Sequence, residues 1–262
     1  MATSQGKFVW YELMTTDPDA AAAFYARVVG WNVADAGMPG MKYSFVKAGA
    51  DSVGGIMALP DSAKAMGAGP AWDGYIAVAD VDAAAARAAA AGATIYKAPE
   101  DIPGVGRFAV LGDPHGASFM LFRGTPGDEP PPAPAPDAPG HVGWHELHAG
   151  DGPAAFAFYS GQFGWEKREA MDMGPAGVYQ LFGLAGSDKQ ASIGGIMTKM
   201  AQTPRPHWLY YFTVDAIDAA VERINGAGGK VVNGPMEVPG GSWIVNAVDP
   251  QGAMFALVAP KR

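Results

Sequence analysis

Two glutamates occupy the same place in two similar segments, WYEL at 10–13 and WHELH at 144–148. The surrounding residues alternate like a β-strand, in which side chains two residues apart share a face. A glutamate turned into an apolar cavity must be paired, or its pKa rises until it is neutral. A raised pKa suits a carboxyl group to remove a proton from carbon next to a carbonyl. Glu12 and Glu146 are therefore candidate catalytic bases; the alternative is a structural role, accepting hydrogen bonds from the backbone or a core tyrosine.

Counting alternate residues on six strands predicts which other side chains line a cavity. Most of them are aromatic or apolar and a few are polar, which is the usual lining of a small-molecule site. The predicted ligand-binding residues are Trp10, Glu12, Asp73, Tyr75, Met120, Trp144, Glu146, His148, Tyr211 and Met254.

The WHELH segment contains an HxxH pattern, but on a strand His145 and His148 point to opposite faces. Glu146 and His148 do share a face, and His207 has the matching parity on another strand. These three side chains are a candidate for a displaced metal site. The corresponding residues of the first segment are Glu12, Met14 and Ala71, so such a site could exist only once.

Composition narrows the classes of partner. Hydrophobic residues make up 49% of the 262 residues, charged residues make up 17%, and the net charge is −8. The acidic balance without a basic run argues against nucleic acid, and no apolar stretch approaches the ~18 residues of a membrane span. The absence of cysteine removes disulfides and thiolate chemistry. With no signal-peptide pattern at its start, the chain is expected in the cytoplasm, with a small molecule as partner.

The elements that position these residues occur twice. The segment at 10–31 matches the segment at 144–165 without a gap, GGIM recurs at 54–57 and 194–197, and the DPHG turn at 113–116 corresponds to DPQG at 249–252. A proline-rich stretch at 124–140 separates the copies and favours an extended linker. We therefore expect domains at 1–123 and 141–262.

The sequence pattern predicts two βαβββ units in each half. Strands are expected near 8–14, 31–36, 42–48, 53–58, 74–79, 93–97, 107–111 and 117–123, and in the second half near 142–148 and 208–214. Helices are expected after Asp17-Pro18, after Asp80 or Asp82 up to Gly92, and at 215–225. The fold class is α+β, with curved sheets enclosing a cavity in each domain. Trp31, Trp165 and the paired Phe-Tyr residues of the helices are expected in the core.

Paired βαβββ units, an opening strand followed by D…FY…GW, and a closing DPxG turn resemble the vicinal oxygen chelate superfamily, which includes glyoxalase I, bleomycin-resistance proteins and extradiol dioxygenases. The resemblance implies a divalent metal held by His, Gln or Glu. The corresponding positions here carry indole, thioether, methyl or isobutyl groups except for one carboxylate, and such groups do not bind a hard cation. No metal is therefore predicted at these positions, which are Trp10, Asp73 and Met120, and Trp144, Leu209 and Ala256.

Three functions remain open, and the sequence does not decide whether the chain is an enzyme. The first is binding of a small, partly apolar molecule in one or both cavities, without the usual metal. The second is a glyoxalase-like lyase or isomerase acting on a small carbonyl compound or its thiol adduct, with Glu12 or Glu146 as base. The third is a structural or protein-interaction role. Two domains on one chain also make a monomer plausible.

Overall fold

The structure is a computed structural model that describes residues 4–38, 40–125, 134–135 and 137–262. The first half folds into two βαβββ modules with a short extra helix between them. Its elements are β1 (Phe8–Thr15), α1 (Pro18–Val28), β2 (Asn32–Asp35), β3 (Tyr43–Ala48), β4 (Asp51–Ala58), α2 (Asp61–Ala65), β5 (Ala71–Ala77), α3 (Val81–Ala90), β6 (Thr94–Ile102), β7 (Gly106–Gly112) and β8 (Ser118–Gly124).

The described residues of the second half repeat this order without the extra helix and add a single 3-10 turn between β10 and β11. Its elements are β9 (Val142–Ala149), α4 (Gly152–Phe163), β10 (Glu166–Asp172), η1 (Gly174–Ala176), β11 (Val178–Gly183), β12 (Gly194–Thr198), β13 (His207–Thr213), α5 (Ile217–Gly226), β14 (Lys230–Glu237), β15 (Trp243–Val248) and β16 (Met254–Ala259). The strand orders are β2-β3-β4-β1-β5-β8-β7-β6 and β10-β11-β12-β9-β13-β16-β15-β14. The predicted α+β class and the paired βαβββ units are confirmed.

Aspartates begin three of the helices, as predicted for the first two. Asp17 and Asp80 accept hydrogen bonds from the backbone N–H groups of Ala20 and Ala83, each at 3.0 Å, and Asp151 caps α4 in the same way. These carboxylates satisfy N–H groups that have no partner inside the helix. Helix α5 differs from the prediction of 215–225, because it begins at Ile217 after an uncapped Ala216 and includes Gly226.

Contacts divide the chain into two compact units, each of which takes modules from both halves. Unit 1 comprises residues 1–9, 74–132 and 145–208; unit 2 comprises residues 10–73, 133–144 and 209–262. Unit 2 thus combines the first and last modules, and unit 1 combines the two middle modules. Most of the predicted linker at 124–140 lies outside the described residues.

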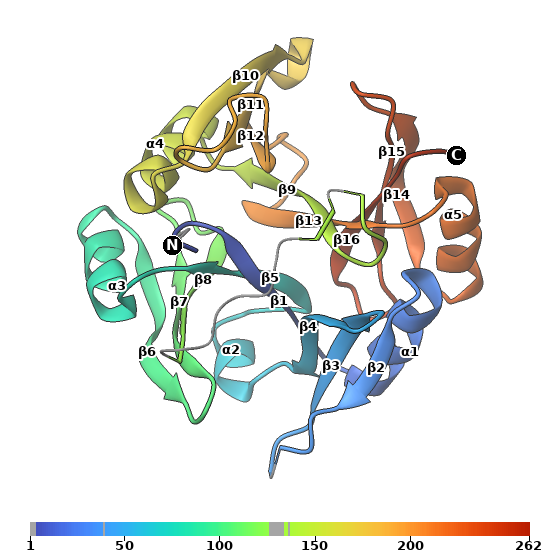
Figure 1. The fold of residues 1–262 in the computed structure, drawn as a ribbon, viewed down its shortest axis with the longest axis horizontal. Helices are drawn as coiled ribbons and strands as arrows, with labels where there is room; N and C mark the ends of the chain where they lie inside the picture. Colours follow the sequence, from blue (N-terminus) through green and yellow to red (C-terminus); the bar gives the residue numbers. More distant parts are fainter. Residues whose placement is uncertain (1–3, 39, 126–133, 136) are drawn as a thin grey trace. The chain divides into compact units, whose positions relative to one another are not determined.

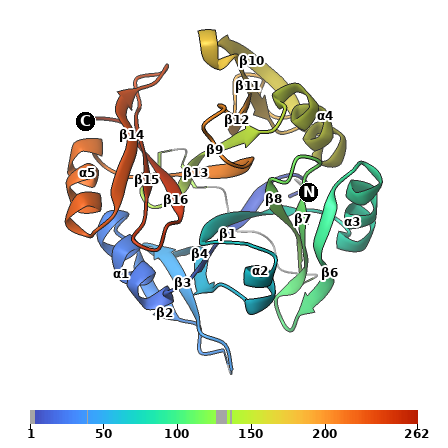
Figure 2. The ribbon, with the colours of Figure 1, turned by 180° about the vertical axis from the view of Figure 1, so that it is seen from behind.

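In unit 2, helix α1 lies beside helix α5, as both Figure 1 and Figure 2 show. Each helix donates to the C-terminal end of the other. Arg27 Nη1 donates to the carbonyl of Gly226, and Arg223 Nε donates to the carbonyl of Val28, both at 3.0 Å. Since the last carbonyls of a helix lack partners and carry partial negative charge, the two guanidinium groups stabilise both helix ends.

The tyrosine of each Phe-Tyr pair reaches the DPxG turn of the opposite half. In unit 2, Tyr25 Oη donates to Asp249 Oδ2 at 3.1 Å and accepts from Trp72 Nε1 at 2.9 Å. In unit 1, Tyr159 Oη makes the corresponding bond to Asp113 Oδ2 at 3.3 Å. The other oxygen of each aspartate holds its own turn by accepting from two backbone N–H groups.

The predicted core aromatics are buried. Trp31 and Trp165 are 4% and 1% exposed, and each indole N–H donates to a backbone carbonyl at 2.8 Å. The prediction that these residues serve packing is confirmed. No helix in the described part of the chain is both long enough and apolar enough to cross a bilayer.

Candidate functional site

In unit 2, Glu12 belongs to a hydrogen-bonded chain of side chains. Trp10 Nε1 donates to Tyr43 Oη at 3.0 Å, and Tyr43 Oη donates to Glu12 Oε2 at 3.0 Å. The direction of both bonds is fixed, because an indole nitrogen only donates and an ionised carboxylate only accepts. Glu12 is 7% exposed, so the phenol replaces water as a donor to a buried carboxylate.

The strand register explains how Tyr43 reaches Glu12. Glu12 lies opposite Gly55 on β4, and Tyr43 lies opposite Met57, two residues further along β4. The Tyr43 ring occupies the space beside Gly55, where an added Cβ would lie 2.8 Å from Tyr43 Cε1 and closer still to its hydroxyl oxygen. The second glycine of GGIM is therefore the gap through which the phenol reaches the carboxylate.

Burial keeps Tyr43 in its protonated form. The loss of hydration raises the pKa of the Tyr43 phenol well above its ordinary value, and the negative charge of Glu12 raises it further. The phenol therefore remains a neutral donor, and its hydrogen bond holds the Glu12 carboxylate in one orientation.

Unit 1 contains the same tyrosine–glutamate pair with one addition. Tyr179 Oη donates to Glu146 Oε2 at 2.8 Å, over Gly195, where an added Cβ would lie 2.5 Å from Tyr179 Cε1. The addition is His148, whose Nε2 lies 2.8 Å from Glu146 Oε1. Both oxygens of Glu146 are thus engaged by side chains of the same unit.

His207 completes a cluster of four polar side chains in unit 1. The His148 and His207 rings stack with their centroids 4.8 Å apart and their planes 13° apart. His207 Nδ1 lies 3.1 Å from the carbonyl oxygen of Arg205. Burial, together with the neighbouring His148, lowers the pKa of His207. The predicted triad of Glu146, His148 and His207 is thus brought together, although no three His, Asp or Glu groups among the described residues converge as metal ligands.

His145 points to the opposite face of β9, as the strand parity predicts. Its ring stacks on Phe8 with centroids 4.1 Å apart, and its Nδ1 lies 2.7 Å from the carbonyl oxygen of Ile193. Burial lowers the pKa of His145 to about 4. This histidine is a neutral packing residue at neutral pH.

The predicted residues of β5 and β8 also come together in unit 1. Tyr75 lies opposite Met120, and the two are 5% and 1% exposed. The Tyr75 ring contacts the rings of Phe108 and Phe122, with centroids 6.3 and 5.9 Å away. Sequence reasoning missed these two phenylalanines, although alternation along β8 places Phe122 on the face of Met120.

In unit 2, Trp144 and Tyr211 belong to one apolar cluster. Tyr211 lies opposite Ala256 in the register of β13 and β16 and is 2% exposed. The cluster consists of Leu209, Tyr211 and Ala256, with Trp144, Ile244 and Val258 packed against it. Asp73 is buried at 4% exposure, whereas Met254 is 38% exposed at the start of β16.

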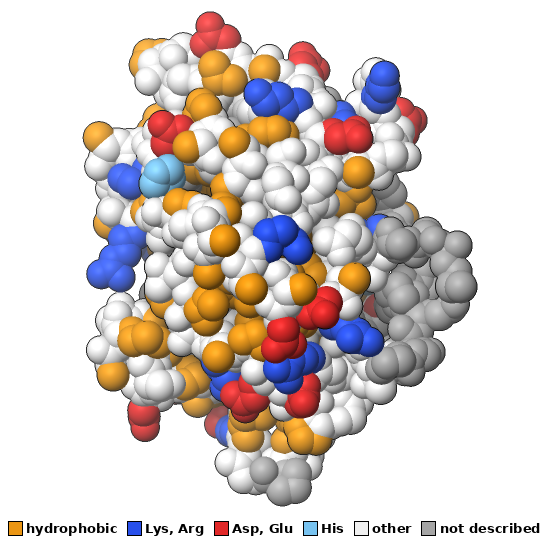
Figure 3. Space-filling model, turned by 90° about the vertical axis from the view of Figure 1, so that its left-hand side faces the viewer, with side chains coloured by type: hydrophobic (Ala, Val, Ile, Leu, Met, Phe, Trp, Pro, Cys, Tyr) orange, Lys and Arg blue, Asp and Glu red, His pale blue; other side chains and the backbone are white. Residues whose placement is uncertain are grey.

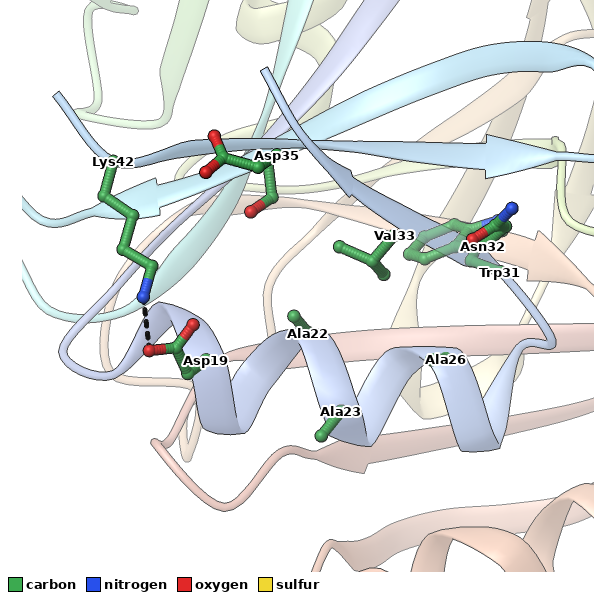
Figure 4. A pocket seen from close by; sticks show the side chains of 10 residues that line it. Asp19, Ala22, Ala23, Ala26, Trp31, Asn32, Val33, Asp35 and Lys42 are labelled. Carbon is green, nitrogen blue, oxygen red and sulfur yellow. Dashed lines mark hydrogen bonds and ion pairs between the residues drawn. The ribbon is translucent and has the colours of Figure 1, made fainter. Parts of the chain in front are cut away.

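Two surface grooves lie away from these clusters. One has a volume of about 580 Å³ between α1 and the β2–β3 hairpin, where Lys42 pairs with Asp19 (Figure 4). The other, of about 250 Å³, is lined by His115, Phe158 and four smaller residues. Neither is lined by a predicted ligand-binding residue, so the enclosed cavity stays a prediction. On the face drawn in Figure 3, Lys and Arg are interspersed with Asp and Glu.

Comparison with known proteins matches each half to a family model. Residues 10–122 match the model of the glyoxalase-like domain, and residues 139–257 match that of the glyoxalase/bleomycin resistance protein/dioxygenase superfamily. CFP32 of Mycobacterium bovis, provisionally named a glyoxylase, is 32% identical and the match covers 98% of this chain and 95% of that protein. The anthracycline biosynthesis protein DauV of Streptomyces sp. strain C5 is 30% identical, covering 97% and 93%.

Among solved structures, the Mn(II)-bound glyoxalase from Novosphingobium aromaticivorans is similar in fold. Its TM-score is 0.62 at 19% identity, over 98% of this chain and 82% of that one. At this identity the likeness concerns the fold, and the chemistry has to come from the side chains described above.

Proposed function

Because the chain belongs to the glyoxalase/bleomycin resistance protein/dioxygenase superfamily, with two such domains in tandem, we propose that it binds a small, partly apolar molecule in its domain cavities. The ligand contacts the strand faces that carry Glu12 and Glu146. It binds without the divalent metal at the positions that the superfamily uses.

One observation carries this proposal. In each half, a tyrosine holds a glutamate in a fixed orientation, and aromatic and apolar side chains lie beside the pair. Both pairs, Tyr43 with Glu12 and Tyr179 with Glu146, depend on a glycine that leaves room for the phenol. A few oriented polar groups on an apolar surface give a ligand both affinity and orientation. The duplication has kept this arrangement in both halves.

The donor set argues against the superfamily's metal. The indole of Trp10 donates its N–H to Tyr43, and Trp144 packs against an apolar cluster. Met120, Leu209 and Ala256 are buried and offer no oxygen or nitrogen. Asp73 is the one carboxylate at these positions, and a single carboxylate is a poor site for a hard cation that prefers six or more oxygens.

An anthracycline is a suitable first probe, because the name of one relative connects it with anthracycline biosynthesis. We expect saturable quenching of anthracycline fluorescence by the chelator-treated protein, unchanged by added Mn(II). Tyr43→Phe and Tyr179→Phe should weaken binding, whereas Tyr96→Phe, at a 40% exposed tyrosine, should not. Should a wider aromatic library also give no saturable binding, or should binding require Mn(II), the proposal is wrong.

The position of Glu146 between Tyr179 and His148 favours a second candidate, the lyase or isomerase. The reaction would move a proton between neighbouring carbons of a 2-oxoaldehyde–thiol adduct, with the glutamate as carrier, and needs no oxidant. The test is turnover of the methylglyoxal–thiol adduct. Turnover by the wild type that is lost in Glu146→Gln supports this candidate; turnover that survives in both Glu12→Gln and Glu146→Gln excludes these bases.

A further inference from the structure

The proton positions of His148 and His207 follow from their partners. His148 Nε2 lies 2.8 Å from Glu146 Oε1. Because an ionised carboxylate only accepts, Nε2 carries a proton, and in the neutral imidazole Nδ1 of His148 then carries the lone pair. His207 Nδ1 lies 3.1 Å from the carbonyl oxygen of Arg205. A carbonyl also only accepts, so Nδ1 carries the proton there and Nε2 of His207 carries the lone pair.

The two lone-pair nitrogens are buried without a partner. Neither His148 Nδ1 nor His207 Nε2 makes a hydrogen bond to any of the described residues, and both atoms are shielded from solvent. A buried acceptor left unsatisfied destabilises the fold, and here two such acceptors lie on stacked rings whose centroids are 4.8 Å apart. Unsatisfied polar groups at one place require a physical reason.

Both rings show the pattern typical of metal-ligating histidines. Such a histidine donates one ring N–H to a carboxylate or a backbone carbonyl, which fixes its tautomer and leaves the other nitrogen for the metal. His148 donates to the carboxylate of Glu146, and His207 donates to the carbonyl of Arg205. The partners that orient a ligand are therefore in place for both rings.

We propose that His148 Nδ1 and His207 Nε2 together bind one transition-metal cation of the zinc, nickel or copper class. Imidazole nitrogen suits these cations, whereas magnesium, calcium and manganese prefer oxygen. Both oxygens of Glu146 are engaged by Tyr179 and His148, so its role is to orient. Because the described residues contain no group of three His, Asp or Glu side chains that could hold a metal, water or a bound molecule completes the coordination.

The site belongs to the second half alone. The residues that correspond to the two histidines in the first half are Met14 and Ala71, which supply no nitrogen. The site also differs from the superfamily positions Trp144 and Leu209, since it uses other residues of the same strands. It therefore stands independently of anthracycline binding, and either can fail without the other.

The experiment is a calorimetric titration of the chelator-treated full-length protein with Cu(II), Ni(II), Zn(II) and Mg(II). We expect one equivalent to bind, with Cu(II) tightest and no binding of Mg(II). His148→Gln and His207→Gln should each abolish stoichiometric binding. Glu146→Gln should weaken it by about 10–100-fold, the usual effect of removing an orienting partner. His115→Gln, at an exposed histidine, is the matched control and should bind like the wild type.

A second measurement uses the wild-type protein, so its result cannot be caused by misfolding of a variant. In proton NMR of the wild type, substoichiometric Cu(II) should broaden the ring signals of two of the five histidines. Assignment of those two signals to His148 and His207 supports the site. Broadening confined to other histidines, absence of stoichiometric binding, or unchanged binding in both glutamine variants at these positions overturns the proposal.

Discussion

Tyr179 reaches Glu146 across a residue that has no side chain. Its hydroxyl lies 2.8 Å from the carboxylate, and the ring fills the space where Gly195 would otherwise carry a Cβ. Tyr43, Gly55 and Glu12 repeat this relationship in the other unit. The orientation of each carboxylate thus depends on a glycine as much as on the tyrosine that donates to it.

Gly195→Ala should therefore destabilise the protein. The added methyl group overlaps the Tyr179 ring, and forced overpacking of this kind costs roughly 1–3 kcal/mol. The free energy of unfolding from denaturant titration measures the loss. Gly161→Ala is the control, because Gly161 lies in helix α4 with nothing within 4 Å of an added Cβ; it should be neutral or stabilising by up to about 1 kcal/mol. Equal behaviour of the two variants would contradict the assigned role of Gly195.

Tyr43→Phe should cost about 1.5–3 kcal/mol, the range for a hydrogen bond to a charged group. The variant keeps the ring but leaves Glu12, which is 7% exposed, without its phenolic donor. Glu12→Gln combined with Tyr43→Phe should recover part of the loss, because a neutral amide needs less solvation than a carboxylate. Thermal and denaturant unfolding measure both variants. If Tyr43→Phe costs the same in the wild type and in the Glu12→Gln background, the two residues are not coupled.

Stability should fall between pH 6.5 and 4 because of His145. The unfolded chain binds a proton at this histidine near pH 6.5, but the folded chain binds it only near pH 4. The contribution is therefore fully present above about pH 6.5 and is lost as the pH falls towards 4, with a total of roughly 3 kcal/mol. In His145→Asn the amide nitrogen takes the place of Nδ1 and does not titrate, so the pH dependence should be flatter. His115→Asn, at an exposed position, should keep the wild-type dependence of unfolding free energy on pH. If His145→Asn shows the same pH dependence as His115→Asn, His145 is not the cause.

Tyr25 and Asp249 should be energetically coupled. Tyr25→Phe removes the donor, and Asp249→Asn keeps the oxygen that holds the DPQG turn while it changes the acceptor of the phenol. A double-mutant cycle should give a coupling of about 0.5–3 kcal/mol. The same cycle with Asp113→Asn, which lies in the other unit, should give nearly additive losses. Additive losses in both cycles would show that the bond contributes nothing.

Local signals in the sequence predicted much of the fold. Aspartate caps located α1 and α3. Alternation along β9 placed Glu146 and His148 on one face and His145 on the other, and alternation along β1 placed Glu12 on the face that corresponds to that of Glu146. Helix caps and strand alternation both depend on residues that are close together in the sequence. The predicted start of α5 lies two residues before the observed start at Ile217, because Ala216 supplies no capping side chain that could mark it.

A core tyrosine was one expected donor to the glutamates, but Tyr43 and Tyr179 were not identified, because their role depends on register across three strands. Tyr43 is 31 residues from Glu12 and Tyr179 is 33 residues from Glu146. A signal did exist: tyrosine opens both YSFVKAG at 43–49 and YQLFGLAG at 179–186, and GGIM follows each. Glycine repeated in a strand marks a close approach by another group, and here that group is the phenol.

The exchange of modules between the halves has a consequence for inheritance. Tyr25 depends on Asp249 and Tyr159 depends on Asp113, so each copy of the duplicated gene encodes half of two bonds. Recombination that replaced one copy with a distant relative's would have to supply matching partners at both ends. The copies have diverged at other positions, as Met14 and His148 show, while the gene as a whole descends as a single unit.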